Sequence, residues 1–115
     1  MRRGRNCPRP SRPRSLPLFR SFSSKLRPAV VLAHAGRVDW VLCQVTSNPY
    51  GDSRAVALTD GSFVSGGLMR DSFARPGKLF TASNSIIVRD AGTLTPEAYR
   101  TIIDSVVKLL QTGGQ

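Results

Sequence analysis

The side chains that usually carry catalysis are sparse in this sequence of 115 residues. There is one histidine, His34, directly after an apolar run, and no second His or Cys stands at metal-ligand spacing from it. A serine triad would need a histidine with partners, and no glycine-rich phosphate loop leads from a strand into a helix. We interpret His34 as a strand-end or loop residue. An enzyme with this sequence must act on a substrate that supplies its own nucleophile.

RNA is such a substrate, because its 2′-hydroxyl sits beside the scissile phosphate. The protein then needs a group that binds the phosphate, for which the planar fork of arginine is suited, and a hydroxyl that orients an oxygen. Arg27 precedes one apolar run and Thr46 ends the next. If the two runs pair as an antiparallel hairpin, both residues lie at the same end of that hairpin. Alternatively, Arg27 is a solvated charge and Thr46 reflects β-propensity.

The elements that must position these residues are short strands. Residues 29–33 form a continuous apolar run, typical of a strand buried on both faces. Arg75-Pro76-Gly77 indicates a turn. Strands are predicted at residues 29–33, 40–46, 54–58, 68–73, 78–82 and 85–89. Short strands at close spacing indicate a small barrel, so the predicted fold class is mainly β with a C-terminal α-helix.

The C-terminal helix has the clearest pattern. Thr95 is an N-cap candidate, Pro96 fits the first helical position and Glu97 suits the positive end of the helix dipole. Apolar residues then recur at helical spacing up to Leu110, and Gly113 follows. We expect an amphipathic helix packed on the barrel.

The net charge of +10 is concentrated near the N-terminus. Residues 1–28 contain nine Lys or Arg and no acidic residue, whereas the remaining 87 contain eight against seven. The body is therefore nearly neutral, and RNA binding there would depend on where its few cations lie. Cys43, within an apolar run, is expected to be a small buried hydrophobe. No apolar stretch approaches the roughly 20 residues of a membrane span, and we expect a cytoplasmic protein.

Four segments resemble the PemK/MazF family of toxins. The first carries basic residues and Arg-Pro into a strand, the second closes a strand with Thr-Ser, the third matches a later strand pair, and the fourth matches the Gly-x-Leu element before the final helix. They are residues 25–32 (KLRPAVVL), 41–48 (VLCQVTSN), 75–81 (RPGKLFT) and 92–97 (GTLTPE). They occur in the family's order and fall within a predicted domain of residues 25–112.

The resemblance implies an SH3-like barrel and the toxin of a type II toxin–antitoxin system, an endoribonuclease that cleaves single-stranded RNA in a sequence-dependent way without metal or cofactor. It implies that Arg27 and Thr46 are the catalytic pair. It also implies a homodimer, an antitoxin with an acidic disordered segment, and DNA binding together with that antitoxin.

Further RNA contacts are expected from cations, which dominate nucleic-acid binding. We predict phosphate contacts from Arg70, Arg75 and Lys78, whose alternative is ordinary surface charge. Ser47 either assists the phosphate contact or caps the following turn.

The sequence departs from the family at its N-terminus. Members normally begin with a Gly-Asp-Ile/Val type strand, and residues 1–24 instead are rich in Pro, Arg and Ser. Prolines oppose strand formation, so we expect a basic disordered tail, a first strand that is missing or replaced, and poor folding with impaired activity.

Two other functions share this fold class. The chain could be a non-enzymatic protein-binding toxin of the same barrel, a gyrase poison like CcdB, or an inactive RNA-binding remnant. The Arg-Pro and Thr-Ser elements favour the ribonuclease, although fold alone does not decide.

Overall fold

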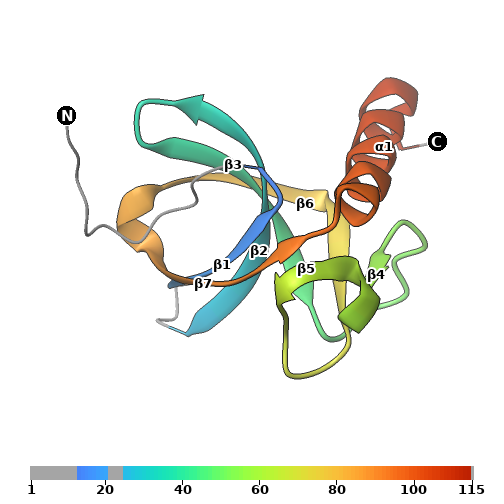
Figure 1. Cartoon of the computed structure of the whole chain (residues 1–115). Coiled ribbons are helices and arrows are strands. Elements are labelled where there is room, and N and C mark those ends of the chain that lie inside the picture. Colours follow the sequence, from blue (N-terminus) through green and yellow to red (C-terminus); the bar gives the residue numbers. More distant parts are fainter. Residues whose placement is uncertain (1–12, 21–24, 115) are drawn as a thin grey trace.

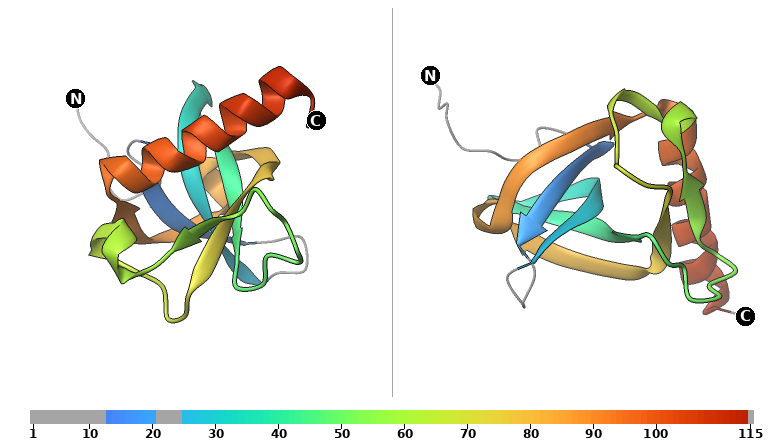
Figure 2. Two further views of the ribbon diagram at one scale, coloured as in Figure 1. Left: turned by 90° about the vertical axis from the view of Figure 1, so that its right-hand side faces the viewer. Right: turned by 90° about the horizontal axis from the view of Figure 1, so that it is seen from below.

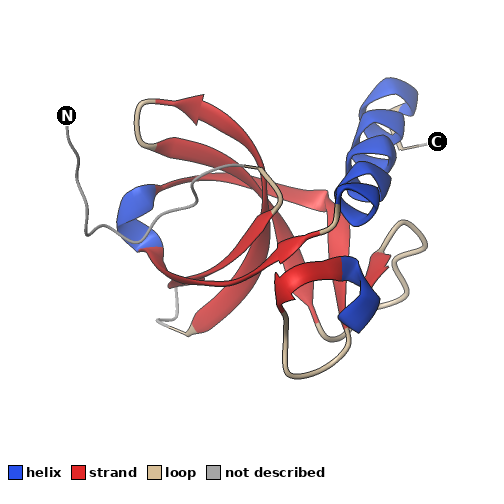
Figure 3. Cartoon of the chain, in the orientation of Figure 1, coloured by secondary structure: helices blue, strands red, loops and turns tan. Residues whose placement is uncertain are grey.

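The computed structural model describes residues 13–20 and 25–114 and contains one antiparallel sheet with one long helix (Figure 1; Figure 3). The seven strands lie in the order β4-β6-β3-β2-β1-β7-β5. Their bounds, with the two 3-10 turns and the helix, are β1 Ser15–Arg20, β2 Leu26–Gly36, β3 Asp39–Thr46, β4 Val56–Leu58, η1 Asp60–Ser62, β5 Phe63–Gly66, β6 Ser72–Ser83, η2 Asn84–Ile86, β7 Ile87–Leu94 and α1 Pro96–Thr112.

The sheet curls around β2, and α1 crosses one side of it (Figure 2). Strand β2 is buried on both faces, as its apolar run predicts, because alternate residues of 29–32 enter two different clusters. Val30 packs in the cluster that contains Ile102 of α1. Val31 packs in the other, with Phe19 of β1. One strand therefore joins the two halves of the core.

The helix begins and ends as the sequence predicts. The Thr95 side chain accepts a hydrogen bond from the Ala98 N–H at 3.1 Å, and proline occupies the first turn. Gly113 adopts the left-handed conformation with φ of 68°, and its N–H donates to the Leu109 carbonyl. In the part of the chain that the structure describes, no helix combines the length and apolar character of a membrane span.

The predicted turn at Arg75-Pro76-Gly77 is wrong, because β6 runs through it. The register to β3 passes from Val45↔Ala74 to Cys43↔Leu79, so β6 bulges between these pairs. Pro76 is fully buried in that bulge, where its missing N–H costs no ladder hydrogen bond. The predicted strand at 68–73 is also displaced. Strand β5 lies earlier, at Phe63–Gly66, and residues 68–71 connect it to β6.

The expectation of a disordered tail is wrong for residues 15–20. They form β1, which pairs with β2 on one side and β7 on the other. Pro17 is tolerated because the register to β7 shifts beside it, between Leu16 and Pro17 and again after Leu18. The first strand is thus replaced by an unusual sequence, not missing. Residues 1–12 and 21–24, the rest of the predicted tail, lie outside the described residues.

If β1 is part of the folded core, truncating Leu16 will destabilise the protein. Leu16 is 0% exposed and belongs to the cluster under α1, so Leu16→Ala leaves a cavity. We expect the free energy of unfolding to fall by about 2–5 kcal/mol in urea denaturation. The matched control is Leu110→Ala at a position 68% exposed on α1, expected to change it by about 0.5 kcal/mol or less. Equal effects of the two substitutions would show that β1 is not in the core.

Candidate functional site

The first two long strands bring Arg27 and Thr46 together, as the hairpin interpretation requires. Strands β2 and β3 are antiparallel, with Ala29 opposite Gln44. Two residues beyond that pair, Arg27 is the second residue of β2 and Thr46 ends β3, and both line one cleft of about 300 Å³. The same rim is completed by β1, whose Phe19 is the register partner of Arg27.

Four of the six predicted site residues line this cleft: Arg27, Thr46, Ser47 and Arg70. We refer to it as the Arg27 cleft. Its remaining wall is largely apolar and comes from β1, β2, β3, the loop after β3, the segment before β6 and the first residue of β6. These further lining residues are Leu18, Leu26, Pro28, Val45, Tyr50, Leu68, Met69 and Ser72.

The charge in the Arg27 cleft is unbalanced. Arg27 and Arg70 are exposed, and neither has an acidic partner within residues 13–20 and 25–114. None of the described residues that line the cleft is a carboxylate or a histidine. Two arginines with no counter-ion make this a place for an anion, and their forked donors suit a phosphate.

The two hydroxyls differ in how they are held. The Thr46 Oγ1 accepts from the Asn48 N–H at 3.2 Å and lies at 3.2 Å from the Asn48 carbonyl, to which it donates. The Ser47 side chain is exposed and makes no hydrogen bond within the part of the chain described. The turn is therefore capped by Thr46 and Asn48, and the Ser47 hydroxyl faces solvent at the cleft.

Arg75 and Lys78 lie outside the Arg27 cleft. The Arg75 Nε donates to Asp52 Oδ2 at 3.0 Å, and its guanidinium lies over the Tyr50 ring, 5.7 Å from the centroid. Lys78 is exposed further along β6 and does not line the cleft. The structure thus separates these two cations from the four residues that it brings together.

Sequence reasoning missed Tyr50 and the apolar wall. Tyr50 lines the Arg27 cleft from a run of turn formers directly after Thr46 and Ser47, and an aromatic residue in such a run was the available signal. Leu18 also lines the cleft, but the sequence gives no signal for it, because its segment is predicted to be disordered.

The other chemically distinctive residues have structural roles. His34 lies near the end of β2, at the opposite end of the hairpin from Arg27, where its Nε2 is 2.8 Å from the Arg37 carbonyl oxygen and its ring packs on Trp40. Cys43 is buried, as expected, and burial raises the pKa of its thiol to about 12. Cys7 lies outside the described residues, among which no His, Cys, Asp and Glu cluster could hold a metal ion.

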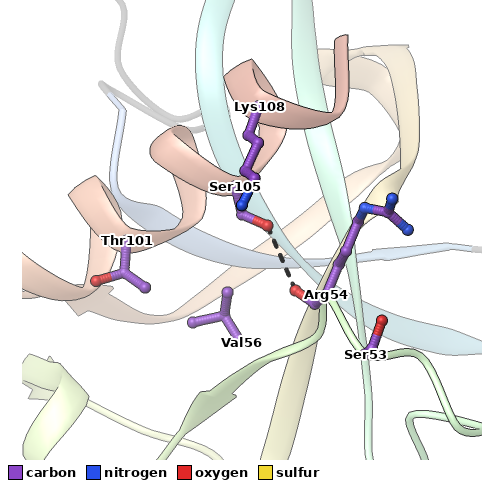
Figure 4. Close-up of a pocket in the computed structure, with 6 residues that line it drawn as sticks. All are labelled: Ser53, Arg54, Val56, Thr101, Ser105 and Lys108. Carbon is purple, nitrogen blue, oxygen red and sulfur yellow. Dashed lines mark hydrogen bonds between the residues drawn. The ribbon is translucent and has the colours of Figure 1, made fainter. Parts of the chain in front are cut away.

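A second hollow, of about 420 Å³, lies between the loop before β4 and α1 (Figure 4). Three of its polar side chains are hydrogen-bonded within the protein. Arg54 Nη2 donates to the Gly114 carbonyl at 2.7 Å, Thr101 Oγ1 donates to the Glu97 carbonyl, and Ser105 Oγ donates to the Arg54 carbonyl. We therefore interpret this hollow as part of the packing between the loop and the helix, which these hydrogen bonds hold together.

The fold is that of the MazF toxins. No protein-family model and no curated protein matches the sequence. Among solved structures, the Mycobacterium tuberculosis toxin MazF-mt6 is 16% identical over 85% of this chain and 97% of the toxin, with a TM-score of 0.70. An endoribonuclease in complex with its cognate antitoxin, from a mycobacterial species, is 14% identical over 93% of this chain and 96% of its own, with a TM-score of 0.71.

The MazF of a MazE–MazF structure from Deinococcus radiodurans gives a TM-score of 0.65 at 20% identity, over 88% of this chain and 94% of its own. At these identities the likeness is one of fold. It confirms the predicted class, a mainly β barrel of the PemK/MazF type with a C-terminal helix.

The ion pair between Asp52 and Arg75 should make the stability of the fold depend on pH. The pKa of Asp52 is lowered, first by the hydrogen bond from the Arg54 N–H and then by that from Arg75. Its ionised form therefore stabilises the fold above the usual Asp value of 3.8, and this contribution is lost as pH falls through the lower folded value. Asp52→Asn should be less stable than wild type near neutrality, and the difference should shrink below pH 3.8.

Thermal unfolding at a series of pH values measures this. Asp104→Asn, at an exposed position of α1, is the matched carboxylate control. A stability difference for Asp52→Asn that persists unchanged at the lowest pH would contradict the assignment.

Proposed function

We propose that this chain is the toxin of a toxin–antitoxin pair and an endoribonuclease that cleaves single-stranded RNA, including mRNA, in the Arg27 cleft. The observation that carries the proposal is the convergence of Arg27, Thr46, Ser47 and Arg70 in one cleft without a carboxylate. The fold of MazF toxins, and its likeness to an endoribonuclease, support the same function. An mRNA substrate implies action in the cytoplasm.

The proposed reaction is an internal transesterification. The 2′-oxygen bonds to the adjacent phosphorus and the bond from phosphorus to the 5′-oxygen breaks, which leaves a 2′,3′-cyclic phosphate and a 5′-hydroxyl. The 2′-hydroxyl proton passes to water, and the departing 5′-oxygen takes a proton from water. Negative charge increases on the phosphate oxygens in the transition state, so fixed donors around them lower the barrier.

Arg27 would supply those donors, because a guanidinium fork can hold two phosphate oxygens at once. Thr46 would orient the reacting phosphate or the 2′-hydroxyl through its Oγ1, whose position Asn48 fixes. Ser47 and Arg70 would bind the same or a neighbouring phosphate. Arg75 and Lys78, which do not line the cleft, would contribute to RNA binding more weakly or at a distance.

The donor set of the Arg27 cleft supports a metal-independent reaction. Guanidinium and hydroxyl groups line the cleft together with apolar side chains, and divalent cations prefer carboxylate, imidazole or thiolate ligands. The substrate supplies the nucleophile, so the reaction needs no metal-bound water.

The proposed partners are a cognate antitoxin and a second copy of the chain. Structural neighbours include an endoribonuclease bound to its cognate antitoxin and a MazE–MazF structure. An acidic antitoxin segment would fit arginines that have no acidic partner in the described residues. A homodimer would extend the RNA-binding surface beyond one cleft.

Substitution of Arg27 tests the proposal. Arg27→Ala should reduce cleavage of a single-stranded RNA pool by at least about 100-fold, the loss typical of one transition-state donor. Arg27→Lys should also fail, because a point charge does not reproduce the bidentate fork. Initial cleavage rates on labelled RNA measure both, with circular dichroism to establish folding.

Arg100→Ala is the matched control, since it removes an exposed arginine of α1 that does not line the cleft and should retain the rate. Cleavage by folded Arg27→Ala at the wild-type rate would remove Arg27 from the mechanism.

The chemistry itself makes a second prediction. Cleavage should persist in excess EDTA, an all-deoxy oligonucleotide should resist it, and the products should carry 2′,3′-cyclic phosphate. Mass spectrometry of the products and parallel assays with and without chelator check these outcomes. Activity that disappears on chelation and returns with added magnesium would refute the mechanism.

A further inference from the structure

Tyr50 is held in an exposed and strained position. It is 70% exposed and has a φ of 53°, in the left-handed region that non-glycine residues seldom adopt. Neither feature helps the fold, because burial of the ring and a relaxed backbone would both be more stable. Tyr50 also lines the Arg27 cleft. An aromatic ring kept in this state at the wall of a cationic cleft indicates a ligand that uses the ring.

The loop around Tyr50 is built to maintain that position. The Tyr50 N–H donates to Asn48 Oδ1 at 2.9 Å, and Asn48 is in turn held by Thr46. On the other side, the Asp52 N–H donates to the Pro49 carbonyl at 2.9 Å and closes the turn. The candidate catalytic hydroxyl of Thr46 and the backbone N–H of Tyr50 therefore belong to one continuous set of hydrogen bonds.

One face of the ring is already occupied. The Arg75 guanidinium lies over it, 5.7 Å from the centroid, and Asp52 anchors the Arg75 Nε at 3.0 Å. Asp52 is fixed by the Arg54 N–H, which donates to Oδ1 at 2.9 Å. The anchored cation stops the ring from folding back against the barrel, and its attraction for the π system orients the ring. At 70% exposure, the opposite face stays open.

We propose that the open face of Tyr50 is a stacking platform for one unpaired base of the RNA strand. The inference rests on the proposed function and adds a base-binding subsite to it. Every base presents a π face, whereas the phosphates would be held by the arginines across the cleft. Arg75 acts as a positioning residue for the ring. This role explains why Arg75 pairs with Asp52 and does not line the cleft.

A binding experiment with two oligonucleotides tests the subsite. The first is a random-sequence single-stranded 2′-O-methyl RNA, which lacks the nucleophile and cannot be cleaved. The second is an abasic sugar-phosphate chain of the same length, which keeps the phosphates and lacks the bases. Affinities are measured by fluorescence anisotropy for wild type, Tyr50→Ala, Tyr50→Phe and Arg27→Ala. Val38→Ala, at the opposite end of the β2–β3 hairpin, is the control for an exposed apolar residue.

We expect Tyr50→Ala to weaken binding of the 2′-O-methyl RNA about tenfold, the loss of one stacked base. Tyr50→Phe should restore it, because the ring is kept, and binding of the abasic chain should be the same for all Tyr50 variants. Arg27→Ala should weaken both oligonucleotides, because both carry phosphates.

The outcomes separate the two proposals. If wild type binds neither oligonucleotide, the proposed RNA-binding function fails. If wild type binds and Arg27→Ala weakens both, while Tyr50→Ala changes neither, the stacking platform is overturned and the function stands. An equal loss on the abasic chain would also overturn it, since the effect would then come from the loop and not from a base.

Discussion

The pairing of β2 with β3 is the constraint on which the rest of the molecule depends. Its register sets Ala29 opposite Gln44 and thereby brings Arg27 and Thr46 to one rim. The register cannot slip by one residue, because alternate positions of β2 are buried in two different clusters and a slip would exchange them. The geometry of the candidate site is therefore fixed by packing at some distance from it, and no contact between the two site residues is needed.

This explains why part of the site was predictable. A buried run, a turn and a second run determine an antiparallel hairpin, so the shared rim of Arg27 and Thr46 follows from the order of residues alone. Ser47 follows Thr46 into the same cleft. Arg70 could be proposed only as a cation, because its place depends on the segment between β5 and β6, which the sequence analysis assigned to a strand.

Two of the wrong predictions, the turn at residues 75–77 and the disorder of residues 15–20, have a common physical origin in proline. Local propensity predicts that Pro17 and Pro76 break strands, yet each lies in a strand beside an irregularity of register. Both are fully buried, and their positions are set by partners that are distant in sequence. The role of Arg75 was hidden for a related reason, since its partner Asp52 lies 23 residues away in the chain. Local propensity describes what proline and arginine prefer, whereas bulges and ion pairs depend on tertiary context.

The place of β1 in the sheet has a consequence for biosynthesis. Its partner on one side is β2, which follows at once, but on the other side it is β7, where Ser15 lies opposite Thr93. A nascent chain leaves the ribosome N-terminus first, so β1 emerges before β7 and its second edge stays open until residues 87–94 have been made. Leu18 of β1 lines the Arg27 cleft, so this wall of the cleft gains its full support only after β7 has been made. The proposed cleavage of RNA would therefore begin only after β7 has been synthesised.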